Sequence, residues 1–467
     1  MSYTLNVEIE KWIIRFMIVA AFLVFAVVSL VNHERFLTFG WDLGFYDQIA
    51  WNLSRLRFPF STFVSAPAFG VRFSPILALL APFYRLYPDA KLLLVVQALL
   101  ATLAVYPLYL LGKRVTRSSY VGIAASLSYL TFIGLERAVF FDFHPDTILP
   151  FFIAWSLYFA HDKRPYLSLF FSLLMLLCKE WVGLLVAAMG VMFLFQKHKR
   201  LGVATTALGL VGFFSVIYLV LPGLGNSGTT LFSFGEFGKS PHQALASILS
   251  HPLAAVLTLV TPQTKLLTMF DSFWPFAFLP IAAPATLLPI FLQFGVRFFD
   301  VSHQQSWTLL YHYSAPLTPF LAYGSIMGIR TFKTRWATHL LVTTSLLGLI
   351  LFHAPVFTLL KSGFYYQPAW IADTRAVLAR VPADVPVAAQ NNLVPHLSGR
   401  EKIYPLPVIG DADFIVVDLH PNQSEYNFHT ADRKAIEELV AGLTFSGAYT
   451  VQFKQGDAIL LQRVPSH

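Results

Sequence analysis

Cysteine and charged residues are scarce in this chain of 467 residues. Cys178 is the one cysteine and lies inside an apolar run. A single cysteine excludes a disulfide framework, so cysteine usage does not indicate the cellular compartment. Only 12% of the residues are charged, whereas 56% are hydrophobic, and the mean hydropathy is +0.61. One soluble domain of this length would lack the polar surface to cover its core. The composition therefore predicts a polytopic, all-α membrane protein.

Several catalytic signatures are also missing. The chain has no Walker-type glycine loop, no paired Cys-x-x-Cys, no His-Glu-x-x-His and no Gly-x-Ser-x-Gly motif. Nucleotide hydrolysis, structural zinc and serine hydrolase chemistry therefore gain no support. The apolar runs show no obvious inverted repeat, which argues against a secondary transporter.

The formal charge of +8 reflects membrane orientation rather than nucleic-acid binding, because the cations cluster in short tracts between apolar runs. The positive-inside rule places these tracts and the N-terminus in the cytoplasm. The tracts cover residues 113–117, 162–164, 197–200 and 330–335. About eleven spans put all four on one side: 12–31, 91–112, 119–135, 146–160, 166–178, 181–196, 201–221, 265–282, 285–296, 314–329 and 336–354.

The chain is expected to have a membrane domain, residues 1–360, and a second domain, residues 361–467. Because the number of spans is odd, the second domain is expected to be extracytoplasmic. The first outer loop, residues 32–90, contains Leu43–Leu53, whose apolar residues recur at helical spacing and predict a helix along the membrane surface. The long outer loop, residues 222–264, is expected to hold one short helix, Pro241–Ser250.

The last hundred residues predict a small α/β domain. Alternating apolar residues indicate strands, and Ala431–Gly442 indicates an amphipathic helix with a glycine stop. The expected strands are residues 385–390, 402–406, 414–419, 448–453 and 458–463.

Two carboxylates belong to the region of the predicted surface helix, Asp42 directly before it and Asp47 within it. Asp42 and Asp47 are five residues apart, which separates their side chains by about 140° on a helix, so they cannot both serve one small site. Asp42 stands at the start of the helix, where it is either a cap or a catalytic carboxylate. Asp47 is more typical of a surface or supporting residue.

A second polar cluster precedes the span 146–160. Asp142, His144 and Asp146 alternate in the pattern that cation binding or base catalysis requires, although Asp146 is equally suited to cap the next helix. Lys179 and Glu180 stand between two apolar runs, where charges need a partner or a function unless the turn is solvated.

Further cationic or hydrogen-bonding groups occur at outer span ends. Arg72, Arg137 and His312 are placed where a lipid phosphate would need them. Each alone is also typical of a headgroup anchor.

These motifs together carry a resemblance to a known family. The segments Trp41–Leu53, Arg72–Pro75, Phe141–Asp146, Lys179–Glu180 and Tyr311–Pro316, in that order, resemble the membrane family of domain of unknown function 2079. That family resembles a branch of the GT-C glycosyltransferases, which take sugars from polyprenyl-phosphate carriers on the outer face of the membrane. The resemblance covers about residues 10–355 and implies GT-C-like interfacial helices in the first outer loop.

The resemblance implies roles for individual residues. Asp42 would be the catalytic carboxylate, acting as general base or metal ligand. Leu43 replaces the second acid of the superfamily pair, so Asp47 or Asp142 substitutes for it or no metal is used. The implied catalytic residues are Asp42, Asp47, Asp142 and His144; those for the carrier phosphate are Arg72, Arg137, Lys179 and His312; those for a metal, Mg²⁺ or Mn²⁺, are Asp42, Asp142 and Asp146; and those in support are Tyr46, Glu180, Tyr311 and Tyr313.

The implied function is transfer of a sugar from a polyprenyl-phosphate donor to an extracytoplasmic acceptor, by a multi-pass protein of the cell membrane. The expected partners are the lipid bilayer and the lipid-linked sugar, with no nucleic acid. A lipid or polysaccharide translocator and a glycan-binding envelope scaffold are the alternatives. The sequence leaves the donor sugar, acceptor, metal dependence and oligomeric state open.

Overall fold

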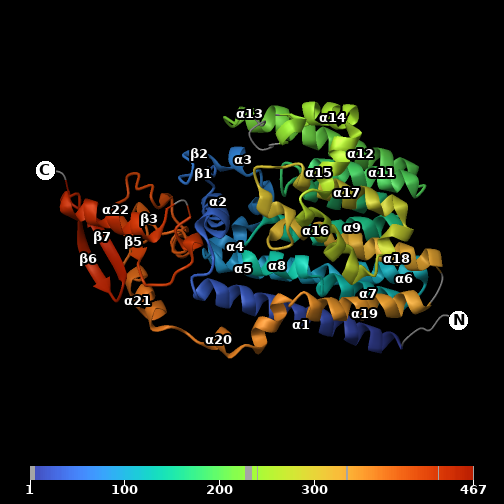
Figure 1. Cartoon of the computed structure of the whole chain (residues 1–467), viewed down its shortest axis with the longest axis horizontal. Helices are drawn as coiled ribbons and strands as arrows, with labels where there is room; N and C mark the ends of the chain where they lie inside the picture. The colour runs from blue at the N-terminus through green and yellow to red at the C-terminus, as the bar shows by residue number, and fades with distance from the viewer. Residues whose placement is uncertain (1–5, 227–233, 239, 333–334, 430, 466–467) are drawn as a thin grey trace.

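The two ends of the molecule differ in architecture, as Figure 1 shows: helices fill one end, and a small sheet with α21 and α22 lies at the other. The computed structural model describes residues 6–226, 234–238, 240–332, 335–429 and 431–465. The prediction of a helical protein with a small C-terminal α/β part is confirmed. Residues 227–233 of the long outer loop and residues 333–334 of the last basic tract lie outside the described residues.

Three helices of the described residues are long and apolar enough to cross a membrane. They are α1 (Val7–Glu34), the pair α5 (Lys91–Leu103) and α6 (Val105–Thr116), and the run of α12 (Lys199–Ser215), η3 (Val216–Val220) and α13 (Leu221–Gly223). Two bent pairs raise the number to five: α7 (Ser119–Leu130) with α8 (Ile133–Phe141), and α14 (Pro241–Ser250) with α15 (Pro252–Val260). The total of eleven spans stays a prediction.

The remaining helices of the bundle are shorter, and a second expected span is broken in addition to 119–135. Residues 265–282 do not form one helix, because Pro275 and Pro280 remove backbone donors and end the helical ladder. The segment divides into α16 (Gln263–Phe273), η6 (Trp274–Phe276) and η7 (Leu279–Ala282). The other helices are α9 (Pro145–His161), α10 (Pro165–Leu176), α11 (Val182–Phe195), α17 (Pro284–Phe298), α18 (Thr318–Phe332) and α19 (Arg335–Leu351).

Glycines bring α11 and α12 into close contact. A Cβ atom on Gly209 of α12 would lie 2.3 Å from the backbone nitrogen of Ala187 in α11. A Cβ atom on Gly190 of α11 would lie equally close, 2.3 Å, to the nitrogen of Thr206. Helices in lipid associate through such close packing, because lipid tails are as apolar as the side chains they would replace.

The first outer loop folds into short elements that surround α2 (Phe45–Ser54). The predicted helix forms, but it does not lie open on a surface: every residue from Phe45 to Asn52 is buried. Its neighbours in the chain are η1 (Gly40–Gly44), β1 (Phe60–Ser61), β2 (Ala66–Pro67), α3 (Ala68–Val71), η2 (Pro75–Leu80) and α4 (Ala81–Leu86). Both α4 and η2 pack on α2, which explains why its polar face is also covered.

The C-terminal part contains a five-stranded sheet in the order β4-β3-β5-β7-β6. β3 pairs with β4 and β5 in parallel, and β7 pairs with β5 and β6 antiparallel. Alternate residues face opposite sides, so Ile415 and Val417 join the core under α22 while Val416 faces the other core. The elements are α21 (Ala369–Leu378), β3 (Val387–Ala389), β4 (Ile403–Pro405), β5 (Phe414–Asp418), α22 (Arg433–Phe445), β6 (Tyr449–Gln455) and β7 (Ala458–Arg463).

A segment of the C-terminal part packs directly on η1. Gly40 donates its backbone N–H to the backbone oxygen of Asn391 at 2.8 Å, and a Cβ on Gly40 would lie 2.9 Å from Val394 Cβ. A Cβ on Gly44 would meet Val394 Cγ1 at 2.9 Å. The two glycines therefore make room for this segment. The remaining short helices are η5 (Gly235–Phe237), η8 (Gln304–Trp307), η9 (His312–Ser314), η10 (Pro355–Leu360), α20 (Ser362–Tyr365), η11 (Val394–His396) and η12 (Glu425–Asn427).

Candidate active site

A cavity of about 700 Å³ lies between the first outer loop and the helical bundle. Its walls come from η1, α2, the start of α9, the turn between α10 and α11, α17 and the segment 300–313. Tyr426 and His429 of the C-terminal part also line this main cavity. The lining residues that the sequence singled out are Asp42, Tyr46, Arg72, His144, Asp146, Lys179, Glu180, Tyr311, His312 and Tyr313.

Asp42 lies in the π-helical turn η1 with one carboxylate oxygen engaged. Its Oδ1 accepts hydrogen bonds from Arg72 Nη1 at 3.1 Å and from His144 Nε2 at 2.8 Å. No hydrogen bond or ion pair within the described residues uses Oδ2. Burial raises the pKa of Asp42, but His144 and Arg72 outweigh burial and hold that pKa well below its usual range. The carboxylate is therefore ionised and offers one free oxygen to the cavity.

Arg72 is held in place by aromatic faces as well as by Asp42. Its guanidinium lies 5.2 Å from the ring centre of Phe45 and 5.5 Å from that of Tyr46. Such contacts fix a guanidinium and keep it charged in a partly buried site. The arrangement supplies a fixed cation next to the ionised Asp42.

His144 and His312 form a stacked pair inside the cavity. Their ring centres are 3.4 Å apart and their planes differ by 9°. Burial lowers the pKa of both rings, and it outweighs the opposing influence of Asp42 on His144. The neighbouring His144 lowers the pKa of His312 further. Both imidazoles are therefore neutral near pH 7, and His144 donates its Nε2–H to Asp42. The buried Nδ1 atoms of both rings have no hydrogen-bond partner among the described residues.

Lys179 pairs with Asp146 rather than with its neighbour Glu180. Its Nζ lies 2.7 Å from Asp146 Oδ2. Burial lowers the pKa of Lys179, but Asp146 outweighs burial and holds that pKa above its usual value. Burial also raises the pKa of Glu180, whose Oε2 has no hydrogen-bond partner in the described part of the chain. Lys179 and Glu180 thus both line the main cavity, rather than lying in a solvated outer turn.

His144, Asp146 and His312 form a group that can hold a metal ion. One ligand atom from each residue lies within 4.8 Å of the others. Two imidazoles and one carboxylate suit a transition metal such as Zn²⁺ better than Mg²⁺, which prefers oxygen ligands. This group shares only Asp146 with the set expected from the sequence, Asp42, Asp142 and Asp146. Asp142 accepts a hydrogen bond from the backbone N–H of Phe39 at 3.0 Å.

Three sequence-predicted residues do not line the main cavity: Asp142, Asp47 and Arg137. Asp142 is fully buried, and its bond to Phe39, the residue before η1, anchors the turn that holds Asp42. Asp47 accepts hydrogen bonds from Tyr84 at 2.9 Å and Ser398 at 2.7 Å, on another side of α2. Arg137 lies on α8.

Sequence reasoning missed Arg297, which lines the cavity at the end of α17. Its guanidinium donates to the backbone oxygens of Ser306 at 2.8 Å and Thr308 at 2.7 Å, so it orders the segment that presents His312. The signal was available, since Arg297 directly follows the apolar run 285–296 at an outer span end. Tyr426 and His429 gave no comparable signal.

One protein family and several solved structures are similar to this chain. The sequence profile of a family described as predicted membrane protein (DUF2079) matches residues 32–460. The crystal structure of ArnT from Cupriavidus metallidurans bound to undecaprenyl phosphate matches with a TM-score of 0.57 and 12% identity, covering 98% of both chains. The same protein in the apo state matches with a TM-score of 0.49 and 13% identity, covering 95% of this chain and 97% of that chain. No curated protein matches the sequence.

Proposed function

Because this chain belongs to the DUF2079 family of predicted membrane proteins, as its motifs indicated, we propose that it is a GT-C-type glycosyltransferase. It moves a sugar from a polyprenyl-phosphate carrier to an acceptor outside the cytoplasm. The fold shared with ArnT, whose crystal structure holds undecaprenyl phosphate, supports a carrier of this chemical class.

One observation carries the proposal. The ionised Asp42 points a free oxygen into a cavity that also holds the fixed cations Arg72, Lys179 and Arg297. Cleavage of a glycosyl–phosphate bond needs both a base for the acceptor proton and fixed positive charge for the leaving phosphate. A translocator or a scaffold has no need of a carboxylate held ionised beside Arg72, in a cavity that two further cations line.

The reaction follows from these positions. The acceptor oxygen or nitrogen attacks the anomeric carbon, its bond forms as the bond to the carrier phosphate breaks, and Asp42 takes the acceptor proton. Arg72 and Lys179 stabilise the negative charge that develops on the leaving phosphate. His144 keeps Asp42 oriented through its Nε2–H. Direct displacement of this kind inverts the configuration at the anomeric carbon.

The His144, Asp146 and His312 group fits a divalent cation, which would supply Lewis-acid stabilisation of the leaving phosphate when bound. Lys179 already neutralises Asp146 at 2.7 Å, so the site can also hold phosphate charge through its own cations. Metal dependence is decided by measuring turnover with EDTA and with added Zn²⁺, Mn²⁺ or Mg²⁺.

We further propose the orientation of the chain. Eleven spans place the N-terminus in the cytoplasm and residues 361–467 outside, so that the main cavity opens toward the outer face. The membrane domain then comprises residues 1–360. Cysteine-accessibility labelling of Ser446→Cys, an exposed position after α22, tests this orientation in intact cells.

Donor turnover by the purified protein in nanodiscs tests the proposed function. A panel of polyprenyl-phosphate and polyprenyl-diphosphate sugars is offered to wild type, to Asp42→Asn and to Asp457→Asn. Asp457 is exposed in the turn between β6 and β7, so its variant is a matched control. Wild type and the control should release sugar, whereas Asp42→Asn should not. Carrier movement across the bilayer without sugar release would favour a translocator.

A further inference from the structure

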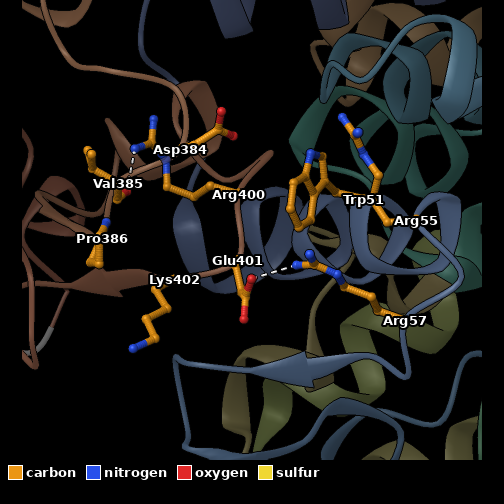
Figure 2. A pocket seen from close by; sticks show the side chains of 9 residues that line it. All are labelled: Trp51, Arg55, Arg57, Asp384, Val385, Pro386, Arg400, Glu401 and Lys402. Carbon is orange, nitrogen blue, oxygen red and sulfur yellow. Dashed lines mark hydrogen bonds and ion pairs between the residues drawn. The ribbon is translucent and has the colours of Figure 1, made fainter.

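A second cavity, of about 410 Å³, lies where α2 meets the C-terminal part. One wall is formed by Trp51, near the end of α2, and by Arg55 and Arg57, which follow the helix. Residues 384–386 and 400–402 form the other wall. Figure 2 shows Arg57 and Glu401 reaching toward each other from the two walls, while the Arg400 guanidinium is directed toward Val385. None of these residues lines the main cavity. This basic cavity is therefore a separate feature of the outer surface.

Cations outnumber acids in the basic cavity by four to two. Arg55, Arg57, Arg400 and Lys402 face Asp384 and Glu401. Arg57 pairs with Glu401 at 2.5 Å, and Lys402 pairs with Asp411, which is outside the cavity. Arg55 and Arg400 have no carboxylate within ion-pair distance among the described residues. The cavity therefore keeps an excess of positive charge, which the two lining carboxylates and Asp411 neutralise only in part.

Arg400 is the most informative of these cations, because it is only 6% exposed. Its guanidinium is fixed by the backbone oxygens of Leu397 at 2.5 Å, Val385 at 2.9 Å and Pro382 at 3.1 Å. Burial lowers the pKa of Arg400 to about 10, which leaves the group charged at neutral pH. Asp384 offsets part of this charge from beyond ion-pair distance, but a buried guanidinium without a directly paired carboxylate is costly unless an anion approaches it.

The Trp51 indole holds the exposed cations in place. The guanidinium carbons of Arg55 and Arg57 lie 5.3 Å and 5.8 Å from its ring centre. Stacking restricts these long side chains, so less entropy is lost when they bind a ligand. The wall is thus prepared for a planar anionic group rather than being a set of free surface arginines.

We propose that the basic cavity binds an anionic saccharide, a sugar that carries carboxylate or phosphate groups, as the acceptor subsite of the proposed glycosyltransferase. The excess cations recognise the anionic group, while Asp384 and Glu401 accept hydrogen bonds from hydroxyls. An anion without hydroxyl donors would be repelled by these two carboxylates. The volume lies within the range of small-molecule sites, about 300–1,000 Å³.

The position of the basic cavity suits an acceptor subsite. Asp42 precedes α2 and Trp51 lies near its end, nine positions later, which is roughly 13 Å along a helix. One rigid, buried helix therefore sets the distance between the proposed base and the bound saccharide. This assignment rests on the proposed function, but binding to the cavity does not require turnover.

Calorimetric titration of the full-length protein in nanodiscs of zwitterionic lipid tests the proposal. The probes are trigalacturonate and mannose 6-phosphate, with neutral maltotriose and inorganic phosphate as comparisons. At least one anionic saccharide should bind more tightly than both comparison compounds. Arg55→Gln, an exposed change, should weaken that binding by about tenfold or more, and Lys434→Gln, an exposed cation of α22, should leave it unchanged.

In zwitterionic nanodiscs, each of three results would overturn the proposal: no binding of either anionic saccharide, equal binding by Arg55→Gln, or equal affinity for inorganic phosphate. Repeating the titration in nanodiscs that contain phosphatidylglycerol separates a saccharide from a lipid headgroup. Loss of saccharide binding there would assign the cavity to the lipid and also overturn the proposal. Because Asp42→Asn should bind the saccharide as wild type does, failure here is distinguishable from failure of donor turnover.

Discussion

At the residue scale, the environments of three aspartates separate their roles. Asp42 is ionised between Arg72 and His144, whereas Asp142, without a cation, uses a backbone N–H and Asp47 uses two hydroxyls. The sequence indicated that Asp42 and Asp47 could not share one site, and the structure places them on different sides of α2. The sequence could not indicate which aspartate would lie next to a cation, because that depends on contacts between segments that are distant in the chain.

Removing the cation beside Asp42 should move the acid limb of the pH–activity profile. Arg72 helps to hold the pKa of Asp42 below its usual range, so Arg72→Gln raises that pKa and leaves Asp42 protonated at a higher pH. As the pH is lowered, the rate of sugar release by Arg72→Gln should therefore begin to fall at a higher pH than the rate of wild type. Arg72→Lys keeps the charge and should shift the limb less. Superimposable profiles for all three proteins would count against this role.

Asp47 should make stability depend on pH. Burial raises its pKa to about 7, although Ser398 and Tyr84 donate to it. The folded protein therefore holds this proton more tightly than the unfolded chain. The free energy of unfolding consequently falls as the pH rises from the usual carboxyl range to about 7. Between pH 5 and 8, the melting temperature of Asp47→Asn should fall less than that of wild type; parallel curves would contradict this.

At the element scale, composition and spacing located helices but not their breaks. The runs 12–31 and 91–112 correspond to α1 and to α5 with α6, because a long apolar stretch in lipid satisfies its backbone only as a helix. The five expected strands also formed. The run 265–282 is interrupted by Pro275 and Pro280. These prolines are visible in the sequence, but the prediction of one span rested on hydropathy alone.

Close helix packing gives a prediction at this scale. Gly209→Ala places a Cβ 2.3 Å from the Ala187 nitrogen, so α11 and α12 must separate. Overpacking of this kind costs about 1–3 kcal/mol, and the melting temperature in detergent should fall. Gly442→Ala in α22 is the matched control, since a Cβ there meets nothing within 4 Å. Equal melting temperatures for the two variants would show that the close contact is not formed.

At the scale of the whole molecule, the C-terminal part contributes to the site rather than hanging free. Tyr426 and His429 line the main cavity, and the segment around Val394 packs on Gly40 and Gly44 of η1. The sequence predicted the C-terminal sheet but not this contact. Residues 350 or more positions apart share no local pattern from which their proximity follows.

The contact between Val394 and η1 should control the position of Asp42. Gly44→Ala introduces a Cβ 2.9 Å from Val394 Cγ1, which displaces η1 and should reduce sugar release. Adding Val394→Ala removes the opposing atom, so the double variant should recover part of the lost activity. An unchanged rate for Gly44→Ala, or a double variant no better than Gly44→Ala, would contradict this coupling.

The most direct test of the central claim is the rate of sugar release from a polyprenyl-phosphate donor by wild type and Asp42→Asn in nanodiscs. If Asp42 is the base, the variant should be slower by about a hundredfold or more, while melting as wild type does. Equal rates for the two folded proteins would contradict the assignment of Asp42 and with it the proposed mechanism.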